Sequence, residues 1–310
     1  MALNYAEVWS PDLLEIMEQE SLTSPFVTTA VKWLSAKTFH FTQMSTSGYK
    51  SHSRLGGWNK GTVEQTDVPF TLTHDRDIQF MIDKIDVDET NETASIKNIS
   101  EVFHKTQQIP EMDAYFYSKV ATEAQKLEGY HSSTALSSYT KENVYGKLKA
   151  MLSAGKLRRY VAKGALIAYV NSTIMDLLEQ STDFTRKIEM TQIAEGGIGI
   201  ETRITDIDGV TLIEVIDDER FYDKFDFTNG FVPVASTSHK INVLIASPLT
   251  VKTVPKIASI YYFNPGQHTE GDGYLYQDRS LSDTFVFPNG KDNKIDSIYV
   301  DVDTETYSAA

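Results

Sequence analysis

Near the amino terminus, hydrophobic and polar residues alternate in two stretches with the two-residue period of a β-strand. Phe39 and Phe41 alternate with polar residues, and residues 62–73 return rich in Val, Thr and Phe. Residues 55–61, which carry three glycines, separate the two stretches. The pattern predicts a long β-hairpin over residues 36–73. Because a lone polar hairpin is marginally stable, we expect this one to be stabilised by lying on a neighbouring copy.

A helical period of three and four residues follows over residues 91–127 and predicts a long amphipathic spine. We expect Ile109-Pro110 to break the spine and Pro110 to restart it, since proline suits the first helical position. The expected apolar faces are Ile99, Val102 and Phe103 in the first helix and Met112, Phe116, Val120, Ala124 and Leu127 in the second.

The remaining chain alternates between helical and strand-like segments, which indicates an α+β fold without internal repeats. Thr140 is the expected cap of a helix with an apolar face at Val144, Leu148, Met151 and Leu152. Further predicted elements are a buried strand at 165–170, a helix at 173–179, two strands joined by a turn at Asp208-Gly209, and strands at 239–248, 283–287 and 295–302.

Composition indicates a folded protein. The chain has 310 residues, of which 41% are hydrophobic and 23% charged, enough for a substantial core. It has no cysteine, which excludes disulfides and thiolate metal sites. The longest apolar run, residues 165–170, is far shorter than the ~20 residues that a membrane helix needs, and no secretory signal is visible at Met1.

The charge is unevenly distributed along an acidic chain of net charge −14. Residues 1–31 carry five acids and no Lys or Arg, whereas residues 32–60 carry five bases and no acid. Residues 141–163 carry seven bases and one acid, and residues 201–226 carry nine acids and three bases. Blocks of opposite sign permit contacts between copies of one chain. The basic block 141–163 could contact phosphate, but contact with the acidic blocks is the favoured interpretation.

Motifs that would carry chemistry are missing from the sequence. Neither a phosphate-binding loop, a dinucleotide fingerprint nor a nucleophile elbow is present, and the seven histidines lack zinc-site spacing. Asp86-Val-Asp88 and Asp206-Ile-Asp208 lack the Gly and Glu that an EF-hand loop requires. We therefore expect no catalytic site, no cofactor and no metal.

Several blocks, lying in one order, resemble the major capsid proteins of tailed bacteriophages, whose architecture is the Johnson (Hong Kong 97) fold. These blocks are Leu72–Asp83 with Asp86–Thr90, Ile109–Lys119, Gly199–Ile204 with Asp208–Val215 and Arg220-Phe221, Ile241–Pro248, and Asp283–Phe287 with Ile298–Val300.

This resemblance implies a division of the chain into the parts of a capsid subunit. Residues 1–31 would be an amino-terminal arm and residues 32–73 an extended hairpin loop. Residues 74–134 would form a peripheral domain with the spine helix, residues 135–265 an axial domain, and residues 266–310 a return to the peripheral domain.

It also implies a function. The chain would be a structural subunit, not an enzyme, that assembles with itself into hexamers and pentamers of an icosahedral head enclosing double-stranded DNA. A separate scaffolding protein and a portal would be partners, with no membrane partner, assembly in the host cytoplasm and the virion as the final location. The expected intersubunit contacts are Leu13 and Leu14 of the arm and Phe39, Phe41, Trp58 and Lys60 of the hairpin.

Two alternative functions and one additional feature remain open from the sequence. One is an encapsulin-like compartment of the same fold, and another, from a different class, is an acidic hydrolase with a carboxylate pair. Some family members cross-link a hairpin lysine to a neighbour's asparagine; here Lys50 or Lys60 could donate and Asn289 or Asn293 accept, although the motif of that site is missing.

Overall fold

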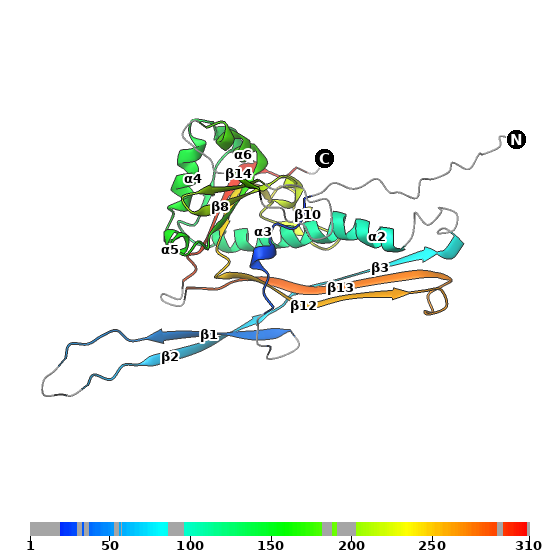
Figure 1. The fold of residues 1–310 in the computed structure, drawn as a ribbon, viewed down its shortest axis with the longest axis horizontal. Helices are drawn as coiled ribbons and strands as arrows, with labels where there is room; N and C mark the ends of the chain where they lie inside the picture. Colours follow the sequence, from blue (N-terminus) through cyan, green and yellow to red (C-terminus); the bar gives the residue numbers. More distant parts are fainter. Residues whose placement is uncertain are drawn as a thin grey trace.

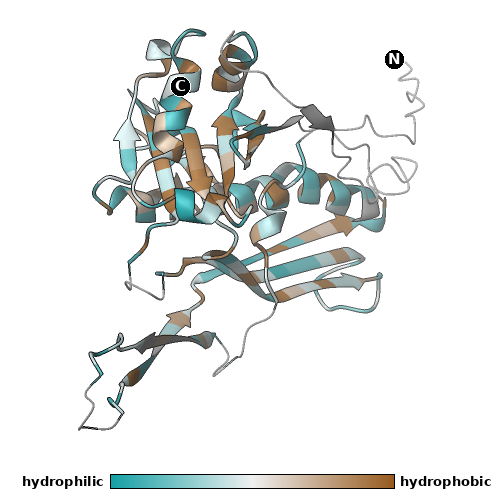
Figure 2. Ribbon diagram, turned by 60° about the vertical axis from the view of Figure 1, so that its left-hand side comes forward, coloured by the Kyte–Doolittle hydropathy of each residue, from teal (hydrophilic) through white to brown (hydrophobic). Residues whose placement is uncertain are grey.

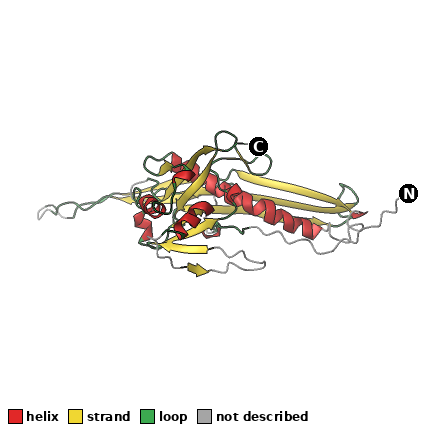
Figure 3. Cartoon of the chain, turned by 90° about the horizontal axis from the view of Figure 1, so that it is seen from above, coloured by secondary structure: helices red, strands yellow, loops and turns green. Residues whose placement is uncertain are grey.

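A computed structural model describes residues 19–29, 33, 37–52, 56, 58–85, 96–181, 188–190, 203–289 and 294–308. Three parts are visible in Figure 1: a projecting hairpin, a long three-stranded sheet beneath a helical spine, and a compact unit around a seven-stranded sheet. Figure 3 shows that the molecule is elongated, with the hairpin at one end and the spine lying along the long strands. The predicted α+β class is confirmed.

The spine is helical without interruption, so the predicted break at Ile109-Pro110 is wrong. Helix α2 (Ile96–Phe103) passes through the π-helix η2 (His104–Gln108) into α3 (Ile109–Gln125). Proline lacks an N–H and its ring crowds the carbonyl four residues earlier. The wider π turn just before Pro110 accommodates both effects and keeps the two helices in line.

The three-stranded antiparallel sheet lies against one side of this spine. Its strands, in the order β12-β13-β3, are β12 (Val251–Phe263), β13 (Gly273–Val286) and β3 (His74–Asp83). Phe80 of β3 packs edge-on against Phe103 of α2, with ring centroids 5.4 Å apart. β12 pairs here although it falls within the range expected for the axial domain, because its pairing partner β13 belongs to this sheet.

The seven-stranded sheet is the centre of the compact unit and has the order β4-β14-β11-β5-β8-β7-β6. Its strands are β4 (His131–Ser133), β5 (Ile167–Asn171), β6 (Ile188–Met190), β7 (Arg203–Ile207), β8 (Val210–Val215), β11 (His239–Ala246) and β14 (Ile298–Thr306). β14, expected in the peripheral part, lies inside this sheet beside β11. The predicted strands at 165–170 and 239–248 are confirmed as central strands.

Alternate side chains of these strands enter two different cores. Val170 and Val243 pack with α4 (Val144–Leu152) and α6 (Ser172–Glu179) on one face. Tyr169 and Leu244 pack with α3 on the other. Figure 2 shows the resulting hydrophobic strands between helical layers. Burial on both faces explains why these strands read as continuous apolar runs.

The expected apolar face of α4 is confirmed, since Val144, Leu148, Met151 and Leu152 are all buried. The expected cap at Thr140 is wrong. α4 begins at Val144 with Asn143 as N-cap, and the Asn143 side chain instead accepts a hydrogen bond of 2.9 Å from the Thr140 N–H. This bond closes a local turn ahead of the helix.

Short elements complete the fold: η1 (Ser24–Phe26), η3 (Leu136–Ser138), α5 (Arg158–Val161), η4 (Asp218–Arg220), β9 (Phe225–Asp226) and β10 (Val232–Pro233). The predicted hairpin is confirmed as β1 (Thr38–Thr46) paired antiparallel with β2 (Val63–Thr71). No helix in the described ranges is long and apolar enough to cross a membrane.

Candidate subunit-contact surfaces

The base of the hairpin is packed into the body of its own chain. Phe39 is only 1% exposed and lies in a third core with Leu72, Val254, Leu281 and Phe287. This placement differs from the expectation that Phe39 faces a neighbour. An aromatic ring covered on all sides by its own subunit supports the hairpin and offers no surface to a second copy.

The tip of the hairpin is exposed. Trp58 is 93% exposed and Tyr49 is fully exposed, while Lys60 is exposed beside them. Two segments, residues 46–52 and 58–61, line an open hollow of about 950 Å³. Two exposed aromatic rings at the end of a projecting element form an unusual surface for a protein that functions alone.

The described residues of the tip bond to one another across its two sides. The Thr62 N–H donates to Ser47 Oγ at 2.9 Å, and Asn59 Nδ2 donates to the Ser51 carbonyl at 2.8 Å. β1 and β2 form a two-stranded sheet of their own, and Figure 1 shows them directed away from the other sheets. Since a two-stranded ribbon is marginally stable in water, the tip gains little stability from its own strand pairing.

A buried carboxylate fixes the point where the hairpin joins the body. Asp283 of β13 is 1% exposed. Its Oδ2 accepts from the Thr73 N–H at 2.9 Å and from Thr73 Oγ1 at 2.8 Å, and its Oδ1 accepts from Tyr115 Oη at 2.8 Å. Thr73 lies between β2 and β3, so these bonds tie the hairpin's return strand to the spine and the sheet.

An exposed ion cluster reinforces the same junction. Arg279 donates to both Asp75 oxygens, at 3.1 and 3.0 Å, and Lys37 Nζ lies 2.9 Å from Asp75 Oδ2. Hydrogen bonds from Arg279, and then from Lys37, lower the pKa of Asp75 to about 2. Lys37 precedes β1 and Asp75 lies on β3, so the cluster joins both ends of the hairpin to β13.

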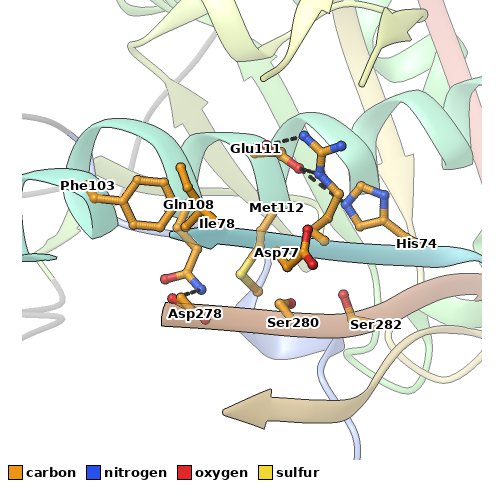
Figure 4. Close-up of a pocket in the computed structure, with 11 residues that line it drawn as sticks. His74, Asp77, Ile78, Phe103, Gln108, Glu111, Met112, Asp278, Ser280 and Ser282 are labelled. Atoms are coloured by element: carbon orange, nitrogen blue, oxygen red, sulfur yellow. Dashed lines mark hydrogen bonds and ion pairs between the residues drawn. The ribbon is translucent and has the colours of Figure 1, made fainter. Parts of the chain in front are cut away.

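A small pocket lies between the sheet and the spine next to this junction. Figure 4 shows His74 reaching from β3 toward Glu111 of α3, and Gln108 meeting Asp278 of β13. Arg76 Nε donates to Glu111 Oε1 at 2.6 Å. Burial acts to raise the pKa of Glu111, but the hydrogen bonds from His74 and Arg76 outweigh it and hold the pKa below its usual value.

This pocket is too small for a substrate. Its volume is about 50 Å³, against roughly 300–1,000 Å³ for a ligand site. Its residues His74 and Arg76 are engaged with Glu111 across the joint between β3 and α3. Among the described residues, no group of His, Asp and Glu side chains is arranged to hold a metal ion.

The amino-terminal segment that the structure describes is fastened to its own chain. Asp113 is fully buried in α3 and accepts from Thr23 Oγ1 at 2.7 Å, from the Leu22 N–H at 3.1 Å and from Arg220 Nη1 at 3.2 Å. Arg220 Nη2 also donates to the Gln19 carbonyl at 2.8 Å. A buried ion pair thus clamps residues 19–23 between the spine and the turn after β8.

Sequence reasoning missed this clamp and the Asp283 junction. Asp113, an acid three residues after Pro110, can also be explained as a favourable charge near a helix amino end, so local pattern alone does not indicate its burial. The signal that could have identified it is its place among the buried residues Ala114, Tyr115 and Phe116, because a carboxylate on an apolar helix segment requires partners.

The other expected contact residues are placed as follows. Leu13, Leu14 and Asn293 lie outside the described residues. Phe41 lies in β1 opposite Val68, but its side chain is outside the described part. Lys50 and Lys60 lie together at the tip, where Lys50 Nζ donates to the Lys60 carbonyl at 3.3 Å, and Asn289 Nδ2 donates to Asp296 at 3.3 Å.

Comparison with known proteins identifies solved structures that share this architecture. No family model matches the sequence, and no curated protein matches it. Solved structures do match. The mature capsid of bacteriophage PhiM1 aligns over 97% of this chain and 92% of its own at 12% identity, with a TM-score of 0.63. The capsid structure of cyanophage P-SCSP1u aligns over 98% and 94% at 10% identity, with a TM-score of 0.60.

The chain has the tailed-phage capsid fold. A solved structure from Mycobacterium phage Che8 aligns over 97% of this chain and 98% of its own, at 13% identity and a TM-score of 0.56. The match therefore extends over hairpin, spine and both sheets of the capsid fold at once. Identity this low demonstrates the shared fold, and the role of the chain is inferred below.

Proposed function

We propose that this chain is the major capsid protein of a tailed bacteriophage. Many copies would assemble into pentamers and hexamers and close an icosahedral head around double-stranded DNA. The role is mechanical: many individually weak contacts, repeated over a closed shell, add up to a stable container. The chain performs no catalysis in this role and requires no cofactor.

The observation that carries the proposal is the hairpin. Its base is locked into the body by Phe39, Asp283 and Asp75, while its tip carries Trp58 exposed to solvent. A rigid base and an uncovered tip suit an element that reaches over a second copy. The near-complete alignment with phage capsid structures supports the same conclusion.

Partners and location follow from this role. A separate scaffolding protein would guide curvature and a portal would occupy one vertex, with assembly in the host cytoplasm. Residues 32–73 would be the extended loop, the spine with the three-stranded sheet the peripheral domain, and the seven-stranded unit the axial domain. Because the chain is acidic overall, it would enclose the DNA without binding it tightly.

Shortening the hairpin tests the proposal. Residues 47–62 are replaced by Asn-Gly, which forms a two-residue turn and preserves the pairing of Thr46 with Val63. We expect the subunit to fold with an unchanged melting temperature but to form no closed shells under conditions in which the unaltered chain forms them. The measurement is negative-stain electron microscopy with analytical ultracentrifugation. Normal shells from the shortened chain would contradict the proposal.

The encapsulin-like alternative is distinguished by the contents of the shell. A phage head purified from infected cells would contain double-stranded DNA that resists nuclease. A compartment would instead co-purify with a protein cargo and no genome.

A further inference from the structure

Two charged surfaces lie at opposite ends of the seven-stranded sheet. The register places Ile167 of β5, Ala246 of β11 and Ile298 of β14 together at one end. At the other end, His239 of β11 lies opposite Thr306 of β14, and Asn171 of β5 lies beside Val215 of β8.

The end at Ile167 carries the basic surface, formed by Lys156, Arg158, Arg159 and Lys163 around α5. α5 is held there because Tyr160 Oη donates to the buried Asp296 at 2.6 Å and the Ala165 N–H donates to the Tyr160 carbonyl at 3.2 Å. All four basic residues are exposed, and no acid occurs between Glu142 and Asp176. Asp208 also lies at this end, where Lys149 Nζ pairs with it at 3.2 Å.

The end at His239 carries the acidic surface, formed by Asp217, Asp218, Glu219, Asp226 and Glu305. The segment after β8 is held there by the Ile241 N–H, which donates to the Phe221 carbonyl at 2.9 Å, and by the Asp218–Lys240 ion pair. Glu219, Asp226 and Glu305 are exposed. Figure 1 shows α5 and the β10 region on opposite sides of this unit.

The two surfaces of one copy are too far apart to neutralise each other. β11 has eight residues, which span about 26 Å at ~3.3 Å per residue. Charges that distant are screened at physiological salt, where the Debye length is about 8 Å. The two surfaces of one copy therefore do not compensate each other's charge.

We infer that the basic α5 surface of one copy docks on the acidic surface of the next copy in the same ring. This inference rests on the proposed function. Two different, complementary surfaces on opposite sides of a subunit make a head-to-tail contact, which closes into a ring when the rotation between copies closes. Opposite charge selects this arrangement over head-to-head pairing, since like charges would then meet.

Double-stranded DNA is the competing partner for the basic surface. The inner genome offers phosphates, and four exposed bases could contact them. A second copy is favoured because the complementary acidic surface is present on the same chain, and because a chain of net charge −14 repels DNA as a whole.

Charge exchange tests the inference in the full chain. One variant carries Lys156→Glu, Arg158→Glu and Lys163→Glu; a second carries Glu219→Lys, Asp226→Lys and Glu305→Lys; a third carries all six. Arg159, Asp217 and Asp218 are left unchanged because they pair with Asp296, Arg220 and Lys240. Lys84→Glu, at an exposed site outside both surfaces, is the control.

Ring and shell formation is followed by sedimentation and electron microscopy. We expect each triple variant to reduce the yield of rings by about 10-fold or more. The variant with all six substitutions should regain ring formation, because its two surfaces are complementary again with the signs exchanged. The control variant should assemble like the unaltered chain. Circular dichroism confirms that each variant folds. A milder variant, with Lys156→Gln, Arg158→Gln and Lys163→Gln, removes the positive charges without reversing them and should weaken assembly less.

The outcomes separate the hypotheses. Normal rings from both triple variants would overturn the docking inference while leaving the proposed function intact. Loss of binding to a linear double-stranded DNA fragment by the basic-surface variant, with normal rings, would assign that surface to DNA and also overturn the inference. If the unaltered chain forms neither rings nor shells, the proposed function fails and the inference fails with it.

Discussion

The central strands and the hairpin strands are both rich in β-forming residues, yet they bury their side chains differently. In β11, all residues from Ile241 to Ala246 are buried, because helical layers cover both faces of the sheet. In the hairpin, Phe39 is buried at the base whereas Met44 and Val63 near the tip are 61% and 67% exposed. The same strand chemistry gives a buried core where its own chain covers the strands and leaves apolar side chains exposed where it does not.

Under the proposed function, this difference separates the residues that stabilise a single copy from those that serve assembly. The seven-stranded unit is stabilised by burial within one copy, so changes there should alter unfolding. The hairpin tip contributes little burial to its own copy, so changes there should alter association alone. The following predictions test that separation.

The largest effect is expected in the buried clamp. Arg220→Met leaves Asp113 buried without its cation, and breaking such a pair costs about 3–5 kcal/mol. The loss should appear in the free energy of unfolding measured by urea denaturation. Lys126→Met, which removes the exposed Lys126–Glu123 pair, is the control and should change stability by less than about 0.5 kcal/mol. A loss below about 1 kcal/mol for Arg220→Met would show that the clamp is dispensable.

The hairpin base should be nearly as sensitive. Phe39→Ala leaves a cavity in the third core. The Phe39 ring centroid lies 5.2 Å from that of Phe285 and 5.7 Å from that of Phe70. Removing a buried phenyl ring costs about 3 kcal/mol or more. Thermal unfolding of the unassembled subunit measures it.

The tip should respond in the opposite way. Trp58→Ala removes a ring that is 93% exposed, so the stability of the isolated subunit should change by less than about 0.5 kcal/mol. Under the proposed function, the same change should reduce the yield of closed shells. Equal losses of subunit stability for Trp58→Ala and Phe39→Ala would contradict the division between tip and base.

The smallest effect concerns the ion cluster at the junction. The pKa of Asp75 is lowered from 3.8 to about 2, so its stabilising charge is present above pH 4 and is lost as the pH falls from about 4 to about 2. Asp75→Asn should therefore reduce the free energy of unfolding at pH 7 by less than about 1 kcal/mol, which appears as a slightly lower melting temperature. The gap between the two melting temperatures should narrow as the pH falls below 4, and a constant gap would contradict this role.

Local pattern was sufficient for elements whose signals lie within a few residues. The two-residue period predicted β1 and β2, and helical spacing predicted the buried face of α4. The turn predicted at Asp208-Gly209 is present, with both residues at positive φ (52° and 80°), which Asp tolerates and Gly favours.

Local pattern failed where a distant partner decides the outcome. β12 was missed because Pro255 and Lys256 interrupt its apolar pattern. Proline is tolerated there since β12 is an edge strand, and its edge position exists only through pairing with β13. Likewise Pro110 predicted a break, but the π-helix before it keeps the spine continuous.

The sequence by itself therefore determined the α+β class, the hairpin, the buried face of α4 and the separation of charge into blocks; Met112, expected on the apolar face of the spine, is 37% exposed. The tertiary structure alone decided that Asp113 meets Arg220 from 107 residues away and that Thr73 meets Asp283 from 210 residues away. It also decided that the basic residues around α5 and the acidic residues that follow β8 lie at opposite ends of one sheet. Periodicity records which side of an element is apolar. Which distant side chain satisfies a buried charge depends on how the sheets pair, and no local window of sequence contains that information.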